Sequence, residues 1–236
     1  MPRYYCLIPD TRGETILAVP AGEGRWTLPA FDLDMDWFAY ASVALAHSAS
    51  ERFGVAITAL HERGKEVCEL EIQALHWTAP AGTRWIARGE LAATALEPGS
   101  LSGILRAWFT EQESGTAPAI RPSWERRGWY AEAAGWILSA CARLGYAPSG
   151  PVEQVKAAWS LSTILRVGTS AGALYFKADF AKPPSEPAVI AALARRWPGN
   201  MPDVVAADQK RGWMLMRDFG ERALNDESIA HWQAAV

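Results

Sequence analysis

The sequence predicts an α+β protein of two domains joined by a helix. Two segments rich in Pro, Gly and Ser, residues 111–123 and 145–151, lack hydrophobic periodicity and therefore divide the chain. The parts before and after them combine short strand-like runs with helices, and the middle part has helical spacing. We expect a domain at 1–112, a linker and bridging helix at 113–150, and a second domain at 151–236.

Composition limits the classes of function. The chain has 236 residues, of which 50% are hydrophobic, and its net charge of −3 gives no basic footprint for nucleic acid. No apolar run approaches the length of a membrane span, and "MPRYYCLIPD" lacks the apolar core of a secretory signal. Three widely spaced cysteines fit a reducing compartment. We expect a cytoplasmic protein without nucleic-acid or membrane partners, and its oligomeric state stays open.

The first domain is expected to alternate strands with two helices. A helix is expected from Asp36, the N-cap, to Phe53, with Gly54 beyond its end. Its buried stripe consists of Leu45, Ala49 and Phe53, spaced four residues apart. Strand-like runs occur at 3–10, 14–21, 67–77 and 84–89, the first two flank a turn at 11–13, and a short helix is expected at 102–109.

This domain resembles the Nudix hydrolases. The resemblance rests on "WTLP", a helix ending in "ERFGV", and the later "RWIARGELAATALEP". Nudix enzymes hold Mg²⁺ with glutamates on that helix, since Mg²⁺ prefers oxygen ligands. With the motif registered on Gly54, its acidic region falls on residues 47–52, where only Glu51 remains as a carboxylate. Leu33 and Ala39 occupy the places of the upstream glycine and glutamate, so we expect a non-catalytic α/β/α sandwich without a metal site.

The middle part predicts a bridging helix from about Trp129 to Leu144, followed by Gly145. Trp129, Trp136, Ile137 and Leu144 would form its apolar stripe.

The second domain places one lysine within an apolar strand. Runs "STILRV" and "ALYFKA" flank the turn between Gly168 and Gly172 as a hairpin. A helix is expected at 186–197, and "GWMLMRDFG" follows as an apolar strand. Burying the ammonium group of Lys177 costs free energy unless an anion pairs with it. The alternative is a lysine on an edge strand whose head group reaches solvent.

This order of hairpin, strand lysine, helix glutamate and apolar strand resembles the N-terminal lobe of aminoglycoside phosphotransferase-type kinases. In the wider kinase pattern, a strand lysine contacts the ATP phosphates and pairs with a helix glutamate. Lys177 matches that lysine and Glu186 that glutamate. Val189, Ile190 and Leu193 would share the helix face of Glu186.

The resemblance also implies the rest of a nucleotide site. The loop "AAWSLS", residues 157–162, would cover the phosphates, and the strand at 213–217 would lead into the hinge that binds adenine. The alternatives are that the serines are ordinary turn residues and that the methionines only fill the core. The implied nucleotide-binding residues are Lys177, Glu186, Ser160, Ser162, Met214, Met216 and Asp218.

Catalytic residues are not expected in this sequence. In the kinase family they lie in a C-terminal lobe, on a segment resembling "HGDxxxxN", and "ERALNDESIAHWQAAV" does not match it. We expect an N-terminal fragment, itself inactive, of a kinase that uses ATP and Mg²⁺ to phosphorylate a small-molecule hydroxyl whose identity stays open. Two other functions also stay open: a non-catalytic Nudix-like scaffold that binds a nucleotide or a partner, and an atypical Nudix hydrolase.

Overall fold

The computed structural model describes residues 1–34, 38–74, 76–115, 121–159, 162–180, 186–197, 199 and 201–218. The chain forms two compact units, residues 1–135 with 154–163 and residues 136–153 with 164–236. The domain boundaries predicted at 112 and 150 stay a prediction. None of the helices in the described ranges is long and apolar enough to cross a membrane.

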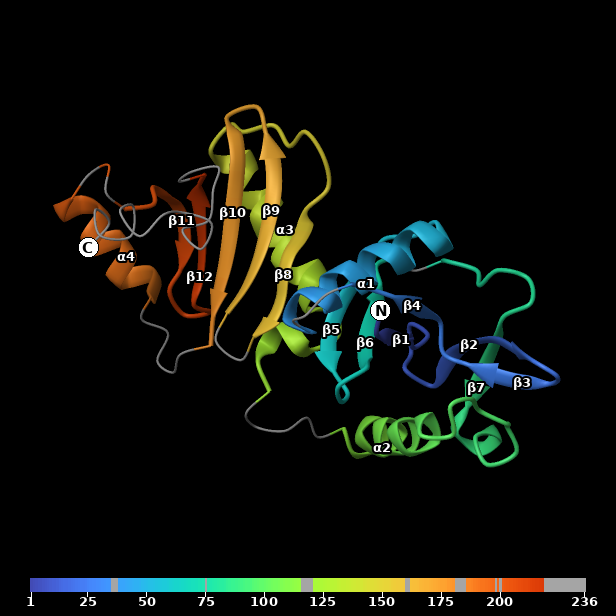
Figure 1. Ribbon diagram of the computed structural model, residues 1–236. Helices are drawn as coiled ribbons and strands as arrows, with labels where there is room; N and C mark the ends of the chain where they lie inside the picture. Colours follow the sequence, from blue (N-terminus) through green and yellow to red (C-terminus); the bar gives the residue numbers. More distant parts are fainter. Residues whose placement is uncertain are drawn as a thin grey trace. The chain divides into compact units, whose positions relative to one another are not determined.

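The first unit contains two β-sheets (Figure 1). One has the strand order β4-β1-β6-β5 and the other β3-β2-β7. The pair β1–β6 is parallel, whereas β1–β4 and β5–β6 are antiparallel. The strands are β1 (Arg3–Leu7), β2 (Thr15–Gly22), β3 (Arg25–Thr27), β4 (Ala30–Asp32), β5 (Ile57–Glu62), β6 (Val67–Ile72) and β7 (Arg84–Ala87).

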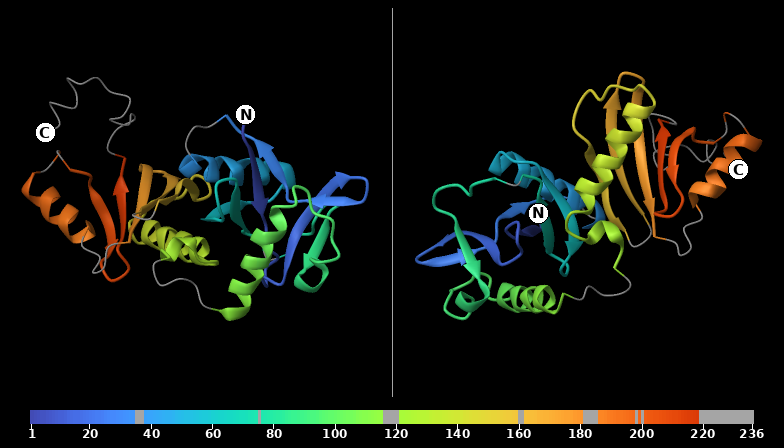
Figure 2. Two further views of the ribbon diagram at one scale, coloured as in Figure 1. Left: turned by 60° about the horizontal axis from the view of Figure 1, so that its bottom comes forward. Right: turned by 180° about the vertical axis from the view of Figure 1, so that it is seen from behind.

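Two helices lie on opposite sides of the four-stranded sheet. They are α1 (Phe38–Phe53) and α2 (Leu101–Ser114), and Figures 1 and 2 show the sheet between them. Because side chains alternate along a strand, Leu7 of β1 faces α2 whereas Cys6 faces the other side. The α2 side of the core holds Leu7, Ile16, Ala18, Leu28, Val67, Ile86, Leu91, Leu101, Leu105, Trp108 and Phe109, all buried. The unit is therefore a layered α+β structure.

The predicted helix and turns of the first unit are largely confirmed. The predicted apolar stripe of α1 is buried, at Leu45, Ala49 and Phe53. Gly54 follows the helix with φ +63°, a backbone conformation that favours glycine. The turn at 11–13 is present, and Asp10 Oδ1 accepts the backbone N–H of Glu14 at 2.8 Å. The proposed N-cap Asp36 lies outside the described residues. The sequence prediction missed β3, β4 and β5.

The segment from residue 111 to the end of α3 differs in part from the expected linker and bridging helix. Residues 111–114 belong to α2, so the predicted linker at 111–123 starts too early. A short 3₁₀ helix, η2 (Ser123–Glu125), precedes α3 (Trp129–Arg143), which confirms the helix predicted at 129–144. Trp129 and Ile137 are buried, but Leu144 is 39% exposed and does not belong to the buried stripe.

The second unit contains most of a sheet with the strand order β11-β12-β10-β9-β8 (Figure 1), whereas residues 154–163, which include most of β8 and the start of β9, are counted with the first unit. Its helix α4 lies beside β11. The elements are β8 (Glu153–Trp159), β9 (Ser162–Thr169), β10 (Gly172–Asp179), α4 (Glu186–Arg196), β11 (Val204–Asp208) and β12 (Trp213–Arg217). The expected hairpin is present, since β9 and β10 are neighbours joined by a two-residue turn.

One face of this sheet is buried. Phe176 of β10 and Trp213 of β12 lie on it, and the ring of Trp136 from α3 packs edge-on against both, with centroid distances of 5.7 and 5.8 Å. Leu174, Ala178 and Leu215 share the same face and are also buried. The opposite face is left with the half-buried residues of β9 and β10, including Lys177.

Candidate functional site

Lys177 and Glu186 form an ion pair in the second unit. Lys177 Nζ donates a hydrogen bond to Glu186 Oε1, and the two side chains are 25% and 31% exposed. The lysine therefore has the anionic partner that its place in an apolar strand requires. Because β10 lies between β12 and β9, the alternative of a lysine on an edge strand is wrong.

The local sequence explains how the glutamate reaches the lysine. Glu186 is the first residue of α4, and Pro187 next to it is buried and compatible with the first turn of a helix. A carboxylate in that turn also interacts favourably with the helix dipole. The expected apolar stripe beside it is incomplete, because Val189 is 50% exposed.

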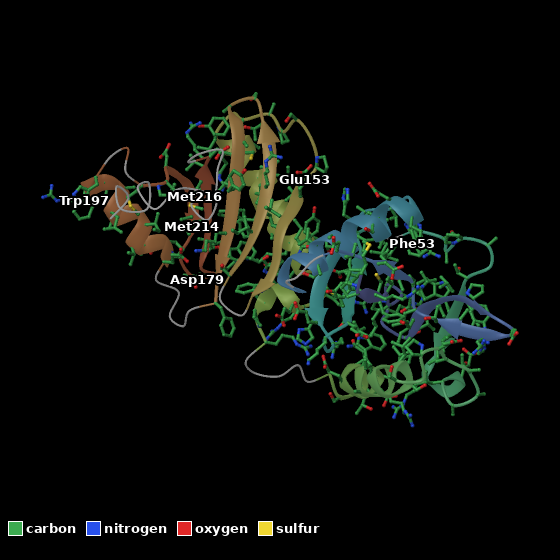
Figure 3. The ribbon with its side chains drawn as sticks, viewed as in Figure 1. Phe53, Glu153, Asp179, Trp197, Met214 and Met216 are labelled. Atoms are coloured by element: carbon green, nitrogen blue, oxygen red, sulfur yellow. The ribbon has the colours of Figure 1, made fainter. Side chains whose placement is uncertain are left out.

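Met214 and Met216 lie on the same sheet face as Lys177. In the antiparallel pairing of β10 and β12, Lys177 is opposite Met214 and Tyr175 is opposite Met216. Residues directly opposite in such a pair point to the same face. Figure 3 labels both methionines on β12. Met214 is buried at 1% exposure and Met216 is half-buried, so apolar side chains adjoin the ion pair.

The predicted phosphate-covering loop is shorter than expected. Residues 157–159 belong to β8, and Ser162 is the first, half-buried residue of β9. The part of the loop left between these strands is residues 160 and 161. Ser160 lies outside the described residues, so its predicted role stays a prediction.

Arg217 anchors the end of β12. Arg217 Nε lies 3.0 Å from Asp203 Oδ2, its Nη2 donates to the Tyr146 hydroxyl, and its guanidinium stacks 5.3 Å from the Tyr146 ring centroid. Asp218 follows as an exposed residue whose backbone N–H donates to Ala173 O at 3.3 Å. Tyr146 and Arg217 lie 71 residues apart in the sequence, so no local sequence pattern could have predicted this contact.

In the first unit, Glu51 is on the surface. Its carboxylate is 71% exposed and lies 3.3 Å from His47 Nε2, one helical turn earlier on α1. Arg52 lies over the rings of Phe31 and Phe53, at 5.8 and 5.5 Å from their centroids. Within the described parts of the chain, no group of three His, Cys, Asp or Glu side chains is arranged to hold a metal ion.

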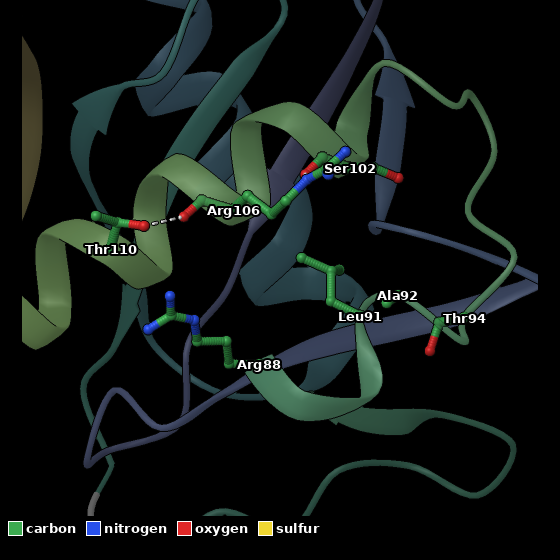
Figure 4. A pocket seen from close by; sticks show the side chains of 7 residues that line it. All are labelled: Arg88, Leu91, Ala92, Thr94, Ser102, Arg106 and Thr110. Atoms are coloured by element: carbon green, nitrogen blue, oxygen red, sulfur yellow. Dashed lines mark hydrogen bonds between the residues drawn. The ribbon is translucent and has the colours of Figure 1, made fainter.

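A surface cavity of about 460 Å³ lies between α2 and the segment around η1 (Arg88–Glu90) (Figure 4). Arg88 and Arg106 line it from the two sides, with Leu91, Ala92, Thr94, Ser102 and Thr110. Arg88 pairs with Glu113, and Arg106 Nε donates to Ser102 O at 3.2 Å. Sequence reasoning did not identify this cavity.

No family model matches the sequence, and no curated protein matches it. Among solved structures, one similar chain is a candidate oxidoreductase from Sinorhizobium meliloti 1021, with 16% identity and a TM-score of 0.35. The match covers 47% of this chain and 39% of that one, so it spans less than half of that protein.

Two further structures are matched over most of their own length. The C-terminal domain of mouse MUTYH, solved in complex with human PCNA, has 18% identity and a TM-score of 0.32, over 50% of this chain and 94% of that one. RenU, a Nudix hydrolase from M. smegmatis, has 21% identity and a TM-score of 0.28, over 50% of this chain and 90% of that one. The chain therefore has a distant structural similarity to a Nudix hydrolase. TM-scores below 0.5 do not establish a shared fold, and none of the three proteins is described as a kinase.

Proposed function

We propose that the second unit binds ATP in the manner of the N-terminal lobe of an aminoglycoside phosphotransferase-type kinase. Lys177 holds phosphate oxygens, Glu186 orients Lys177, and the face with Met214 and Met216 receives the adenine ring. The activity that a kinase of this type would carry out is ATP- and Mg²⁺-dependent phosphorylation of a small-molecule hydroxyl. This chain binds the nucleotide but does not transfer its phosphate.

The observation that carries the proposal is the ion pair between Lys177 and Glu186. In protein kinases, the phosphate-binding lysine lies on the third strand and pairs with a glutamate of the following helix. Lys177 lies on the third strand of its sheet in chain order, and Glu186 begins the helix that follows. Both side chains are partly exposed, so a phosphate can reach the ammonium group without unfolding the sheet. The three structural matches lend no support to this proposal.

The test is ATP binding measured by calorimetry for wild type and Lys177→Met. Loss of a charge-assisted contact to phosphate is expected to raise the Kd at least about tenfold. Lys210→Met is the matched control, because Lys210 is an exposed lysine of the same unit, in the turn between β11 and β12. Equal affinity of wild type and Lys177→Met would refute the proposed phosphate contact.

A second candidate concerns the first unit, as a Nudix-like module that binds a nucleotide or a partner without hydrolysing it. The observation that favours it is Glu51, which is exposed and paired with His47 instead of facing other carboxylates. One carboxylate is too few to hold Mg²⁺ at a diphosphate.

We therefore expect no Mg²⁺-dependent hydrolysis when nucleoside diphosphates, dinucleotides and nucleotide sugars are incubated with the protein and phosphate release is measured. Hydrolysis that is lost in Glu51→Gln and kept in Glu113→Gln, an exposed-carboxylate control, would favour the atypical hydrolase instead.

A further inference from the structure

The segment from Arg121 to Trp129 is held against the rest of the first unit by side-chain contacts. Arg121 pairs with Glu111 of α2, and the backbone N–H of Gly128 donates to Glu71 Oε1 of β6 at 2.8 Å. Within this segment, η2 packs against β5. All of these residues belong to the first unit, so their contacts are independent of the proposed ATP site.

The contact between η2 and β5 joins a histidine to a carboxylate. His61 Nδ1 lies 2.6 Å from Glu125 Oε2, and the two side chains are 26% and 11% exposed. Nδ1 is buried and makes no aligned hydrogen bond with any atom in the described ranges. The contact is therefore favourable chiefly when the imidazole ring carries a positive charge, because attraction between opposite charges does not require the alignment of a hydrogen bond.

A second carboxylate lies near this contact. Glu62 follows His61 on β5, and its carboxylate interacts electrostatically with both His61 and Glu125. Burial raises the pKa of Glu62, His61 lowers it, and Glu125 raises it. The two carboxylates therefore repel each other, and a positive charge on His61 offsets that repulsion.

The other titratable and charged groups described around β5 and η2 are paired, exposed or neutral. Two arginines face two carboxylates in one network, which consists of Arg63, Glu69, Glu111 and Arg121. Arg126 is exposed, and Arg127 donates to the backbone carbonyl of Asp10 and acts on Glu71. Burial keeps the pKa of the Cys68 thiol well above its ordinary value, so this thiol is neutral. His61 is therefore the group whose protonation changes the charge at this contact near neutral pH.

We propose that His61 is a pH-sensitive latch, which in its protonated form holds η2 and residues 121–129 against β5. Histidine ordinarily changes charge between about pH 5 and 8. With a proton, the imidazolium attracts the carboxylate of Glu125, which is largely shielded from water. Without it, Glu62 and Glu125 repel each other and no longer have a positive charge beside them. The segment is therefore bound most tightly at acidic pH, and it loosens as the pH rises and the histidine loses its proton.

The experiment measures hydrogen exchange of single backbone amides by NMR at about pH 5.5 and about pH 8. The rates are expressed as protection factors, which remove the intrinsic dependence of exchange on pH. The reporters are the amides of Glu125, Arg126 and Gly128, whose hydrogen bonds hold the segment in place. Because the charge-assisted contact is present only at the lower pH, we expect protection about tenfold higher there.

His61→Gln and Glu125→Gln keep a polar side chain but cannot form the ion pair. In both variants the protection factors of the reporter amides are expected to be equal at the two pH values. Glu62 and Glu71 are unchanged in these variants, so a pH dependence that came from either of them would persist. Each comparison is made between two pH values of one protein, so a general loss of stability does not imitate the expected result.

His47→Gln is the matched control, because His47 contacts Glu51 at 3.3 Å in an exposed pair on α1 of the same unit. Its reporter amides are expected to show the same pH dependence as those of wild type. The proposal is overturned if protection in wild type does not differ between the two pH values. It is also overturned if the difference survives in His61→Gln or Glu125→Gln, or if it disappears in His47→Gln.

Discussion

Glu111 is a partly buried carboxylate held between two arginines. Burial alone raises the pKa of this group, but hydrogen bonds from Arg121 and Arg63 outweigh that cost and lower it to about 2. Glu62 and Glu71 show the opposite balance, because burial raises the pKa of both above the ordinary value. Arg127 also acts to lower the pKa of Glu71, but too weakly to offset burial. The sign of the shift therefore depends on whether guanidinium groups bind the carboxylate strongly enough to outweigh burial, as Arg121 and Arg63 do at Glu111.

Glu111→Gln is expected to lower the free energy of unfolding at pH 7 by about 2–3 kcal/mol, since it leaves two guanidinium groups without their shared partner. The folded-state pKa is lower than the unfolded one, so the stabilisation is complete above about pH 4.5 and is lost as the pH falls towards 2. Urea denaturation from pH 2 to 7 measures it.

The control for this variant is Glu113→Gln, two residues further along α2, where the carboxylate is 57% exposed. It is expected to change stability by less than about 0.5 kcal/mol. A difference between wild type and Glu111→Gln that persists unchanged at pH 2 would contradict this account.

The pairing of single residues could be predicted from the sequence where each residue stands at a recognisable place in a predicted strand or helix. Lys177 interrupts an apolar strand, and Glu186 begins a helix at a fixed interval after it, so their pairing could be inferred before the structure. The network of Arg63, Glu69 and Glu111 could not be inferred. Its members lie up to 48 residues apart, and charged residues without periodicity look like ordinary surface positions.

At the scale of elements, α3 is the helix that covers the buried face of the five-stranded sheet. Trp136 contacts Phe176 and Trp213, which come from two adjacent strands. A tryptophan placed this way contributes a large apolar area to the core of this unit.

Trp136→Ala is expected to destabilise the second unit by about 3 kcal/mol, through lost burial and the cavity left beside the sheet. Chemical denaturation followed by near-ultraviolet circular dichroism measures the loss. Leu138→Ala, on the same helix at a position that is 42% exposed, serves as the control with little expected change. Equal effects of the two substitutions would mean that α3 does not hold the sheet through Trp136.

The elements missed from sequence were those with weak local signals. β3 and β4 are three residues long, which is too short to show alternation. The end of α2, "EQES", is polar and adjoins Gly115, and it therefore looked like part of the linker. α1 and β10 were found because their apolar spacing runs over many residues.

At the scale of the whole molecule, the two units carry different chemistry. The first has paired carboxylates and an arginine-lined cavity, and the second has a lysine–glutamate pair beside an apolar sheet face. Sequence patterns predicted the α+β class and the order of most elements. They did not predict the cavity, because it depends on side chains that the chain brings together only on folding.

The central claim is that ATP binds at Lys177, and hydrogen exchange measured with and without ATP tests it most directly. A ligand that binds the native state slows the opening of the elements it contacts. We predict slower exchange in β9, β10, α4 and β12, no change in residues 1–115, and loss of the effect in Lys177→Met. Unchanged exchange in the second unit, or protection that survives in Lys177→Met, would contradict the claim.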